Sequence, residues 1–438
     1  MKGIKTGPWG LIALLGLAGC LSVRLPKAQI RPLESEKVVG WQGMVGEALE
    51  NNPDLDSARF ALESRARARD IAFGDYLPSV SGNLDKGRAR SSGSPAHDSL
   101  SLSVEADQAL FTGFETTGNF ISARKDLEAA RFDYQDTSAN VRFRLRSAYI
   151  ELLRLKDLLD VSKRIEQRRR NNAELIQLRY EAGREHLGSL MRAKAIAERA
   201  AFVVRQTDRR IETQSLRLER EMGGEFELPL QVEGTLDTMV PVISGLKPDP
   251  AELAEETPAV QRAMKTAESF KALVLSSQGE LWPHVDGSYD YEDSGTRASD
   301  LKSGSFLGLR ASVPFFNGGK NVNGIRRAEA NYRAAREDAR SVRDETLTQL
   351  AEAWAQLTDA VEFVEVQKNF LEAARKRSEI VRSEYTAGLV NFQDFDIAEQ
   401  DLADSENNYV ESLAAVLSRE ASWQLARGAT LEDAAREI

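Results

Sequence analysis

The chain has 438 residues, of which 42% are hydrophobic and 29% charged, and its formal net charge is -10 with a pI near 5.2. This length accommodates two or more domains or one large repeat protein. The acidic balance argues against a nucleic-acid binder, whose binding face carries an excess of lysine and arginine.

The N-terminus has the pattern of a secretory signal peptide. Two lysines precede the apolar run LIALLGLAG, residues 11–19, which is shorter than the ~20 residues that a membrane-spanning helix needs. The run ends at Cys20, the only cysteine in the chain, as in the lipobox of bacterial lipoproteins. We therefore expect cleavage after residue 19, covalent lipid on Cys20 and, because Leu21 follows, sorting to the outer membrane. The alternative is an ordinary cleavage site that adjoins a cysteine by chance.

The sequence after residue 40 is an internal duplication with an offset of 205 residues. A gapless series of matches at one offset is the signature of a repeat. The matches include Pro53 with Pro258, Pro78 with Pro283, Phe111 with Phe316, Tyr180 with Tyr385 and Gly183 with Gly388. We assign residues 20–40 to a lipidated linker, 41–222 to the first repeat, 223–249 to an inter-repeat linker, 250–427 to the second repeat and 428–438 to a C-terminal tail.

Each repeat begins with a helical stretch, residues 41–74 and 250–279, and ends with a much longer one. Residues 119–182 contain no proline and, as one helix, would extend on the order of 95 Å. Seven positions in each long stretch follow a 3.5-residue period, which indicates a coiled coil. In the first repeat these seam positions are Val141, Leu145, Ala148, Leu152, Leu155, Leu159 and Ser162. Residues 168–170, all arginine, are predicted to form a solvated face, with a partner contact as the alternative.

Two segments in each repeat alternate between apolar and polar residues with period two. These segments are residues 79–85, 99–107, 284–292 and 306–313. The pattern predicts half-buried strands, and with long polar connections it is typical of outer-membrane barrels. A soluble sheet that covers a layer of helices is the alternative. Four strands cannot close a barrel in lipid, so membrane-spanning strands would require at least two copies of the chain.

The order of these features resembles the TolC family of bacterial outer-membrane efflux channels, specifically its lipid-anchored members. The resemblance covers most of the mature chain and depends on the duplication and on short motifs. These motifs are ALENNPDLDSA at 48–58, YLPSVSG at 76–82 and the Y-x-A-G stretches at 180–183 and 385–388. It implies an α+β membrane protein with four strands per chain in a trimeric 12-stranded β-barrel. Long coiled-coil hairpins would extend from the barrel into the periplasm as a tunnel.

The resemblance also implies a function and partners. The homotrimer would be the exit duct of a tripartite efflux system, with a periplasmic adaptor (membrane fusion) protein and an inner-membrane pump as partners. Small molecules are the expected cargo by analogy with lipid-anchored relatives. Metal efflux and type I protein secretion are alternatives within the channel class. A non-porating periplasmic coiled-coil scaffold lipoprotein is the alternative outside it.

Candidate functional residues follow from the same resemblance. The Y-x-A-G stretches would be helix-to-helix turns at the periplasmic tip. Tyr180, Gly183, Tyr385 and Gly388 are candidate adaptor contacts, and both glycines suit the left-handed conformation that ends a helix. Glu181, Glu185 and His186 are weaker tip candidates.

Asp394 and Asp396 are candidates for a pore gate, because a threefold ring of carboxylates favours cations. An exposed acidic helix start is the alternative. Ser189 occupies the position in the first repeat that corresponds to Asp394, which makes a second ring doubtful.

We expect no enzymatic activity. The three histidines are scattered without metal-ligand spacing, and NGGK at 317–320 lacks the spacing of a phosphate-binding loop. No cofactor is expected besides the covalent lipid on Cys20, and a partner must supply the energy for transport.

Overall fold

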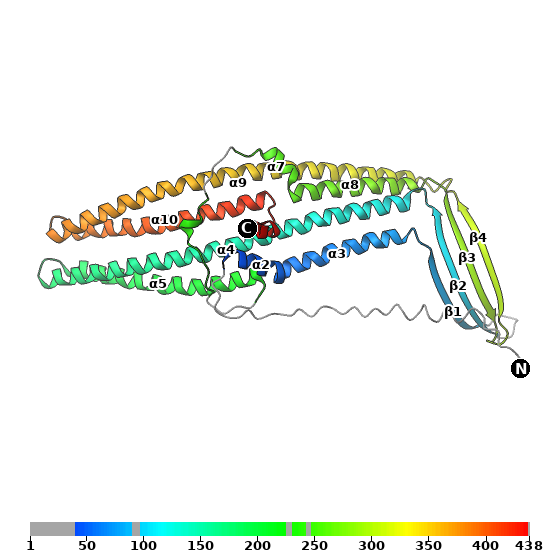
Figure 1. The fold of residues 1–438 in the computed structure, drawn as a ribbon, viewed down its shortest axis with the longest axis horizontal. Helices are drawn as coiled ribbons and strands as arrows, with labels where there is room; N and C mark the ends of the chain where they lie inside the picture. Colours follow the sequence, from blue (N-terminus) through cyan, green and yellow to red (C-terminus); the bar gives the residue numbers. More distant parts are fainter. Residues whose placement is uncertain (1–39, 90–96, 225–229, 242–246, 437–438) are drawn as a thin grey trace.

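The computed structural model describes residues 40–89, 97–224, 230–241 and 247–436. The molecule is elongated, with four strands at one end and two helix-to-helix turns at the other (Figure 1). The elements of the first repeat are α2 (Trp41–Asn51), α3 (Pro53–Gly74), β1 (Ser79–Ala89), β2 (His97–Phe111), α4 (Glu115–Glu181) and α5 (Leu187–Met222). Those that follow are α6 (Leu236–Met239), α7 (Pro250–Glu256), α8 (Pro258–Gly279), β3 (His284–Gly295), β4 (Lys302–Ser312), α9 (Lys320–Ala387), α10 (Phe392–Ala426) and α11 (Leu431–Arg436).

The duplication in the sequence is a duplication of structure. Helices α3, α4 and α5 begin 205 residues before α8, α9 and α10 respectively. The expected helical stretches 41–74 and 250–279 are each divided in two, at Asn52 and Thr257. Each of these residues precedes a proline, which disfavours helical backbone at the residue before it, and the two residues adopt extended ψ angles of 120° and 140°. The Asn52 side chain also caps α3 by accepting hydrogen bonds from the backbone N–H groups of the next helical turn.

The hydrophobic core lies along the helical body, where α4 meets α5 and α10. Seam residues Val141, Leu145 and Leu152 are fully buried there. The sequence predicted one helix over residues 119–182, and α4 is a 67-residue helix that begins four residues earlier. None of the described helices combines the length and the apolar character needed to cross a membrane.

The stretch that we expected to be a C-terminal tail contains a packed helix. Leu431 and Ala434 of α11 are fully buried against α2 and α4. Glu432 accepts a hydrogen bond from the Tyr134 hydroxyl at 2.6 Å and another from Ser138. The segment after the second repeat is therefore tied to the first long helix.

The four strands form one antiparallel sheet in the order β1-β2-β3-β4. The pairing of β2 with β3 joins the two repeats, because β2 belongs to the first and β3 to the second. Helix α8 makes the corresponding junction between helices, since it packs against both α4 and α9. The two repeats thus contact each other through one pair of strands, β2 with β3, and one pair of helices, α4 with α8.

Candidate functional site

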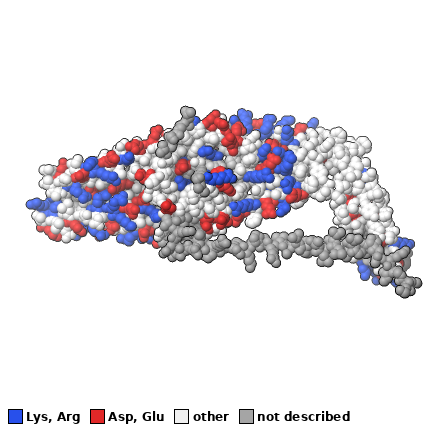
Figure 2. Space-filling view, viewed as in Figure 1, with Lys and Arg blue, Asp and Glu red and all other residues white. Residues whose placement is uncertain are grey.

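The sheet exposes a broad apolar face. Val80, Leu84, Leu307 and Leu309 are between 68% and 81% exposed. Strand pairing aligns Val80, Ala106, Tyr289 and Leu307 in one row across the sheet, so these side chains share a face. Figure 2 shows mainly uncharged atoms over the strands, whereas lysine, arginine, aspartate and glutamate cover the helical body. An apolar face of this extent on an otherwise charged protein indicates contact with lipid or with another protein.

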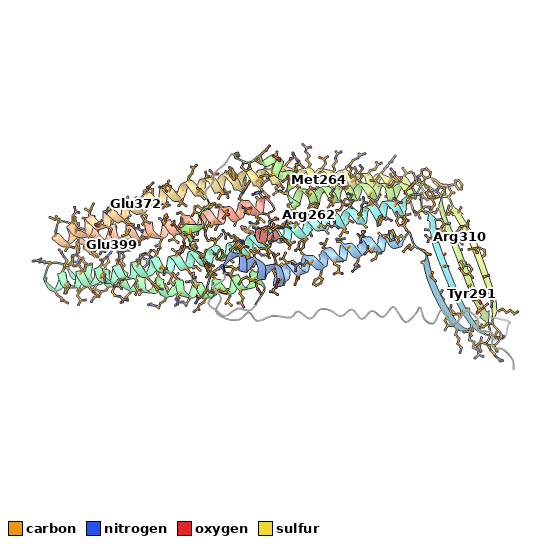
Figure 3. All side chains as sticks on the ribbon, in the orientation of Figure 1. Arg262, Met264, Tyr291, Arg310, Glu372 and Glu399 are labelled. Carbon is orange, nitrogen blue, oxygen red and sulfur yellow. The ribbon has the colours of Figure 1, made fainter. Side chains whose placement is uncertain are left out.

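The opposite face of the sheet is mainly polar and charged, with Phe306 as an exposed apolar residue on it. Asp85, Glu105, Asp290 and Arg310 all lie on it, because they alternate along the strands with the apolar row. Figure 3 shows Arg310 in the strand region, at the end of the molecule opposite to Glu399. This arrangement confirms the four predicted strands and the predicted polarity of their two faces.

Both edges of the sheet are open among the residues that the structure describes. Of the described strands, β1 pairs only with β2, and β4 pairs only with β3. Each edge therefore carries backbone N–H and C=O groups without strand partners along one side. Such groups are not tolerated in the hydrocarbon of a membrane, where no water can satisfy them.

The two Y-x-A-G stretches end the long helices at the other extremity of the molecule (Figure 1). Gly183 and Gly388 adopt φ angles of +69° and +82°, the left-handed conformation expected at these positions. His186 then caps α5 by accepting a hydrogen bond from the Ser189 N–H, and Asn391 caps α10 by accepting one from the Asp394 N–H. The chain therefore reverses at equivalent points in both repeats.

The two tip tyrosines have different surroundings. Tyr180 is 39% exposed, whereas Tyr385 is 1% exposed. The Tyr385 ring stacks on Phe395 with 4.7 Å between centroids, and the Arg179 guanidinium lies 4.6 Å from the centroid of the Tyr385 ring. Its hydroxyl donates a hydrogen bond of 2.8 Å to Glu185. Tyr385 thus joins the two turns to each other, and Tyr180 is the tyrosine that is accessible to a partner.

The two gate candidates also differ. Asp394 is exposed at the start of α10. Asp396 is buried, and its carboxylate accepts hydrogen bonds from Arg169 at 3.3 Å and Arg192 at 2.9 Å. Asp396 therefore does not offer a free carboxylate to a pore within this chain, which corrects the expectation that it would resemble Asp394. Asp396 has a structural role, because Arg169 and Arg192 of the first repeat both bind its carboxylate.

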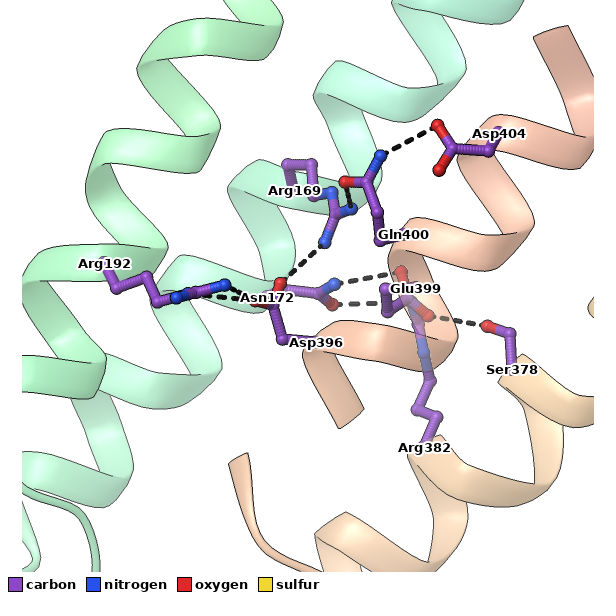
Figure 4. A network of polar contacts seen from close by, with 9 residues as sticks. All are labelled: Arg169, Asn172, Arg192, Ser378, Arg382, Asp396, Glu399, Gln400 and Asp404. Atoms are coloured by element: carbon purple, nitrogen blue, oxygen red, sulfur yellow. Dashed lines mark hydrogen bonds and ion pairs between the residues drawn. The ribbon is translucent and has the colours of Figure 1, made fainter. Parts of the chain in front are cut away.

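Asp396 belongs to a polar network that connects the two hairpins near their tips (Figure 4). Glu399, almost fully buried, accepts hydrogen bonds from Ser378 at 2.7 Å, Arg382 at 3.0 Å and Asn172 at 3.0 Å. Burial alone would raise the pKa of this carboxyl, but the Ser378 hydrogen bond and the Arg382 charge outweigh it and lower the pKa below its ordinary value. The carboxylate is therefore ionised at neutral pH and holds α4 against α9 and α10.

The prediction of a solvated arginine face at residues 168–170 is wrong for two of the three residues. The Arg169 side chain is 6% exposed and also donates a hydrogen bond of 2.9 Å to Gln400. Arg168 forms a bidentate pair with Glu406, and only Arg170 is exposed, where it pairs with Glu166. A signal for this was present in the sequence. Arg169 lies seven residues after Ser162, so the coiled-coil period itself places it on the seam.

Two expectations concern cofactors. Within the described part of the chain, there is no group of three or more histidine, cysteine, aspartate or glutamate side chains that could hold a metal ion. Cys20 and the signal segment lie outside the described residues, so lipid attachment at Cys20 stays a prediction from the sequence.

The geometry defines a class of protein: a sheet with one exposed apolar face that carries a long helical extension built from two related hairpins. The chain belongs to the outer membrane efflux protein family, whose sequence profile matches residues 44–224 and 250–429. It is 20% identical over 370 residues to the outer membrane efflux protein BepC of Brucella suis, covering 82% of this chain and 79% of the relative.

Solved structures show the same fold. The channel-forming protein CusC superposes with a TM-score of 0.81 at 15% identity, covering 90% of this chain and 95% of CusC. The MtrE outer membrane channel of Neisseria gonorrhoeae superposes with a TM-score of 0.80 at 17% identity, covering 90% of this chain and 89% of MtrE. The resemblance to the TolC family drawn from the sequence is thereby confirmed.

Proposed function

We propose that three copies of the chain form the outer-membrane exit duct of a tripartite efflux system that passes small molecules out of the periplasm. The observation that carries this proposal is the four-stranded sheet with an exposed apolar face, a polar face and two open edges. Further strands must pair with both edges before such a sheet is stable in lipid. Three copies supply 12 strands, and closure then places the apolar faces outward and the polar faces around a lumen.

The helical hairpins extend the duct into the periplasm. Their tips, with Tyr180, Gly183 and Gly388 accessible at the turns, are the surface that meets a periplasmic adaptor, and Tyr385 supports that surface from inside. The adaptor connects the duct to an inner-membrane pump that supplies the energy. The acyl groups on Cys20 add a second attachment to the outer membrane. Metal efflux and type I protein secretion stay as alternatives for the cargo.

The test is the mass of the purified mature protein together with its conductance in planar bilayers. A trimer that requires detergent and conducts ions is expected. A Cys20→Ser protein that is monomeric and soluble without detergent would contradict the proposal and favour the periplasmic scaffold.

Asp394→Ala is expected to change the cation selectivity of the duct or to raise its conductance, with little effect on folding. Asp394 is exposed in the first turn of α10, so a ring of three such carboxylates would act on passing ions. Reversal potentials in asymmetric salt measure the selectivity. Ser189→Ala, at the equivalent position of the first repeat, is the control and should leave selectivity unaltered. Unchanged selectivity and conductance in Asp394→Ala would remove this residue from the gate.

A further inference from the structure

The exposed face of α3 and the edges of β1 and β4, which pair with no further described strand, indicate which residues of one copy contact which residues of the next. The assignment rests on the proposed closure of the sheet by further copies. Within one chain, the first repeat contacts the second through α4 with α8 and through β2 with β3. The same contacts can form between the second repeat of one copy and the first repeat of the next copy.

The helices give the first indication. Helix α8 is enclosed between α4 and α9, and Ala267, Ser269 and Ala272 are buried there. Its counterpart α3 packs against α4, and of its residues only Leu55 is buried. Phe60, Ile71 and Phe73 of α3 are at least half exposed. The face of α3 that no described element covers corresponds to the face of α8 that contacts α4.

One pair of positions on this face has complementary residue sizes. Within the chain, Ser276 of α8 donates a hydrogen bond of 2.8 Å to Asn119 of α4. The positions 205 residues away are Ile71 in α3, 73% exposed, and Gly324 in α9. A larger residue thus replaces serine where glycine replaces asparagine. A Cβ atom added to Gly324 would meet only Glu280 Oε2, at 3.8 Å, so space for Ile71 of another copy is present.

The strands give the register. In the contact between repeats, Glu105 of β2 lies opposite Asp290 of β3, and Asp107 lies opposite Ser288. Moving 205 residues forward from β2 gives β4, and moving 205 residues back from β3 gives β1. The counterpart of Glu105 is Arg310, and the counterpart of Asp290 is Asp85. In the same way, Ser312 corresponds to Asp107, and Asn83 corresponds to Ser288.

We propose that β4 of one copy pairs with β1 of the next so that Arg310 lies opposite Asp85 and Ser312 opposite Asn83. All four residues are on the polar face, as their counterparts are, so the apolar faces of the copies form one continuous surface. The contact inside the chain brings two acids together, whereas the contact between copies pairs an arginine with an aspartate. Opposite charges in directly opposed positions favour this register and this order of strands.

Four double-cysteine variants test the register with matched controls. Asp85→Cys with Arg310→Cys and Asn83→Cys with Ser312→Cys place thiols directly opposite, about 4.5–5.5 Å apart between Cα atoms, which a disulfide can span. The exchanged combinations, 85 with 312 and 83 with 310, use the same four positions but are diagonal, about 7–8 Å apart. Within one chain, β1 and β4 are three strand spacings apart, roughly 14 Å, so any disulfide must join two copies.

The assembled protein is oxidised in detergent and analysed on non-reducing gels. The two opposed combinations should convert most of the monomer band into dimers and trimers, and the exchanged combinations and the single-cysteine variants should leave it in place. Equal or stronger cross-linking of the exchanged combinations would overturn the register, as would an absence of cross-links in all four. The mass and conductance of the unmodified protein separate these results from a failure of the proposed function, since a conducting trimer without the expected cross-links refutes only the register.

Discussion

Asp396→Ala is expected to loosen the contact between the two hairpins and to destabilise the tip region by about 3 kcal/mol, at the low end of the cost of breaking a buried ion pair. The substitution leaves the Arg169 guanidinium buried without its carboxylate. Arg192, whose side chain is 67% exposed, returns to water and contributes little to the loss. In bilayers the same variant should conduct more, because the network no longer holds α10 against α4 and α5.

Hydrogen exchange measures this effect locally. Amides near residues 165–176 of α4 and 392–404 of α10 should exchange faster in Asp396→Ala. Asp394→Ala is the matched control, because it removes an exposed carboxylate two residues away and costs only the helix-terminus contribution of about 0.3–1 kcal/mol. Equal protection in the two variants would show that the Arg169–Asp396 pair does not hold the hairpins together.

The stability of the polar network also depends on pH through the Glu399 carboxyl group. The folded-state pKa of Glu399 is lowered, so the stabilisation from its ionised form is present above the ordinary glutamate pKa. It is lost as the pH falls through the lowered folded value. The contact between hairpins should therefore be insensitive to pH near neutrality and weaken in acid, as the pH falls below the ordinary glutamate pKa.

The architecture of this protein could be predicted from the sequence more fully than the polar network between the two hairpins. The strand faces and the long helices depend on patterns within a segment of one repeat, and the repeat offset depends on residue matches between the two repeats, all of which are visible in the sequence. The polar network instead joins residues that are distant in the chain, such as Arg169 with Asp396 and Asn172 with Glu399. Periodicity indicates that a residue faces inward, but it does not say which charged residue on another helix will meet it.

The acidic residues of α10 illustrate this limit. Asp396, Glu399 and Glu406 share the seven-residue spacing of the buried residues Val410, Leu413 and Leu417. That spacing places the acids in the interior, and buried carboxylates require cationic or hydrogen-bonding partners. Both sides of the contact were therefore detectable as charged seam positions. The pairing between them, and the difference between Asp394 and Asp396, required the three-dimensional arrangement.

Tyr385→Ala is expected to have the largest effect of all the substitutions considered, a local loss of about 3–5 kcal/mol, because it removes a buried aromatic ring. Both the stack on Phe395 and the contact with Arg179 disappear. Because Glu185 belongs to the first turn, both turns should lose hydrogen-exchange protection together. Tyr385→Phe keeps the stack and removes only the hydroxyl that donates to Glu185, which costs about 1.5–3 kcal/mol for a hydrogen bond to a charged group.

Tyr180→Ala is the decisive comparison, because the duplication makes Tyr180 the equivalent of Tyr385 in the first repeat. Its side chain is partly exposed, so truncation should barely change protection at either turn. If adaptor proteins bind these tips, Tyr180→Ala should weaken binding without destabilising the duct, whereas Tyr385→Ala should weaken binding only through the loss of local structure. A loss of protection confined to the second turn in Tyr385→Ala, or an equal loss in Tyr180→Ala, would contradict this division between a supporting and a contacting tyrosine. The division follows from packing, since identical residues at equivalent sequence positions acquire different roles when only one of them is covered by the neighbouring hairpin.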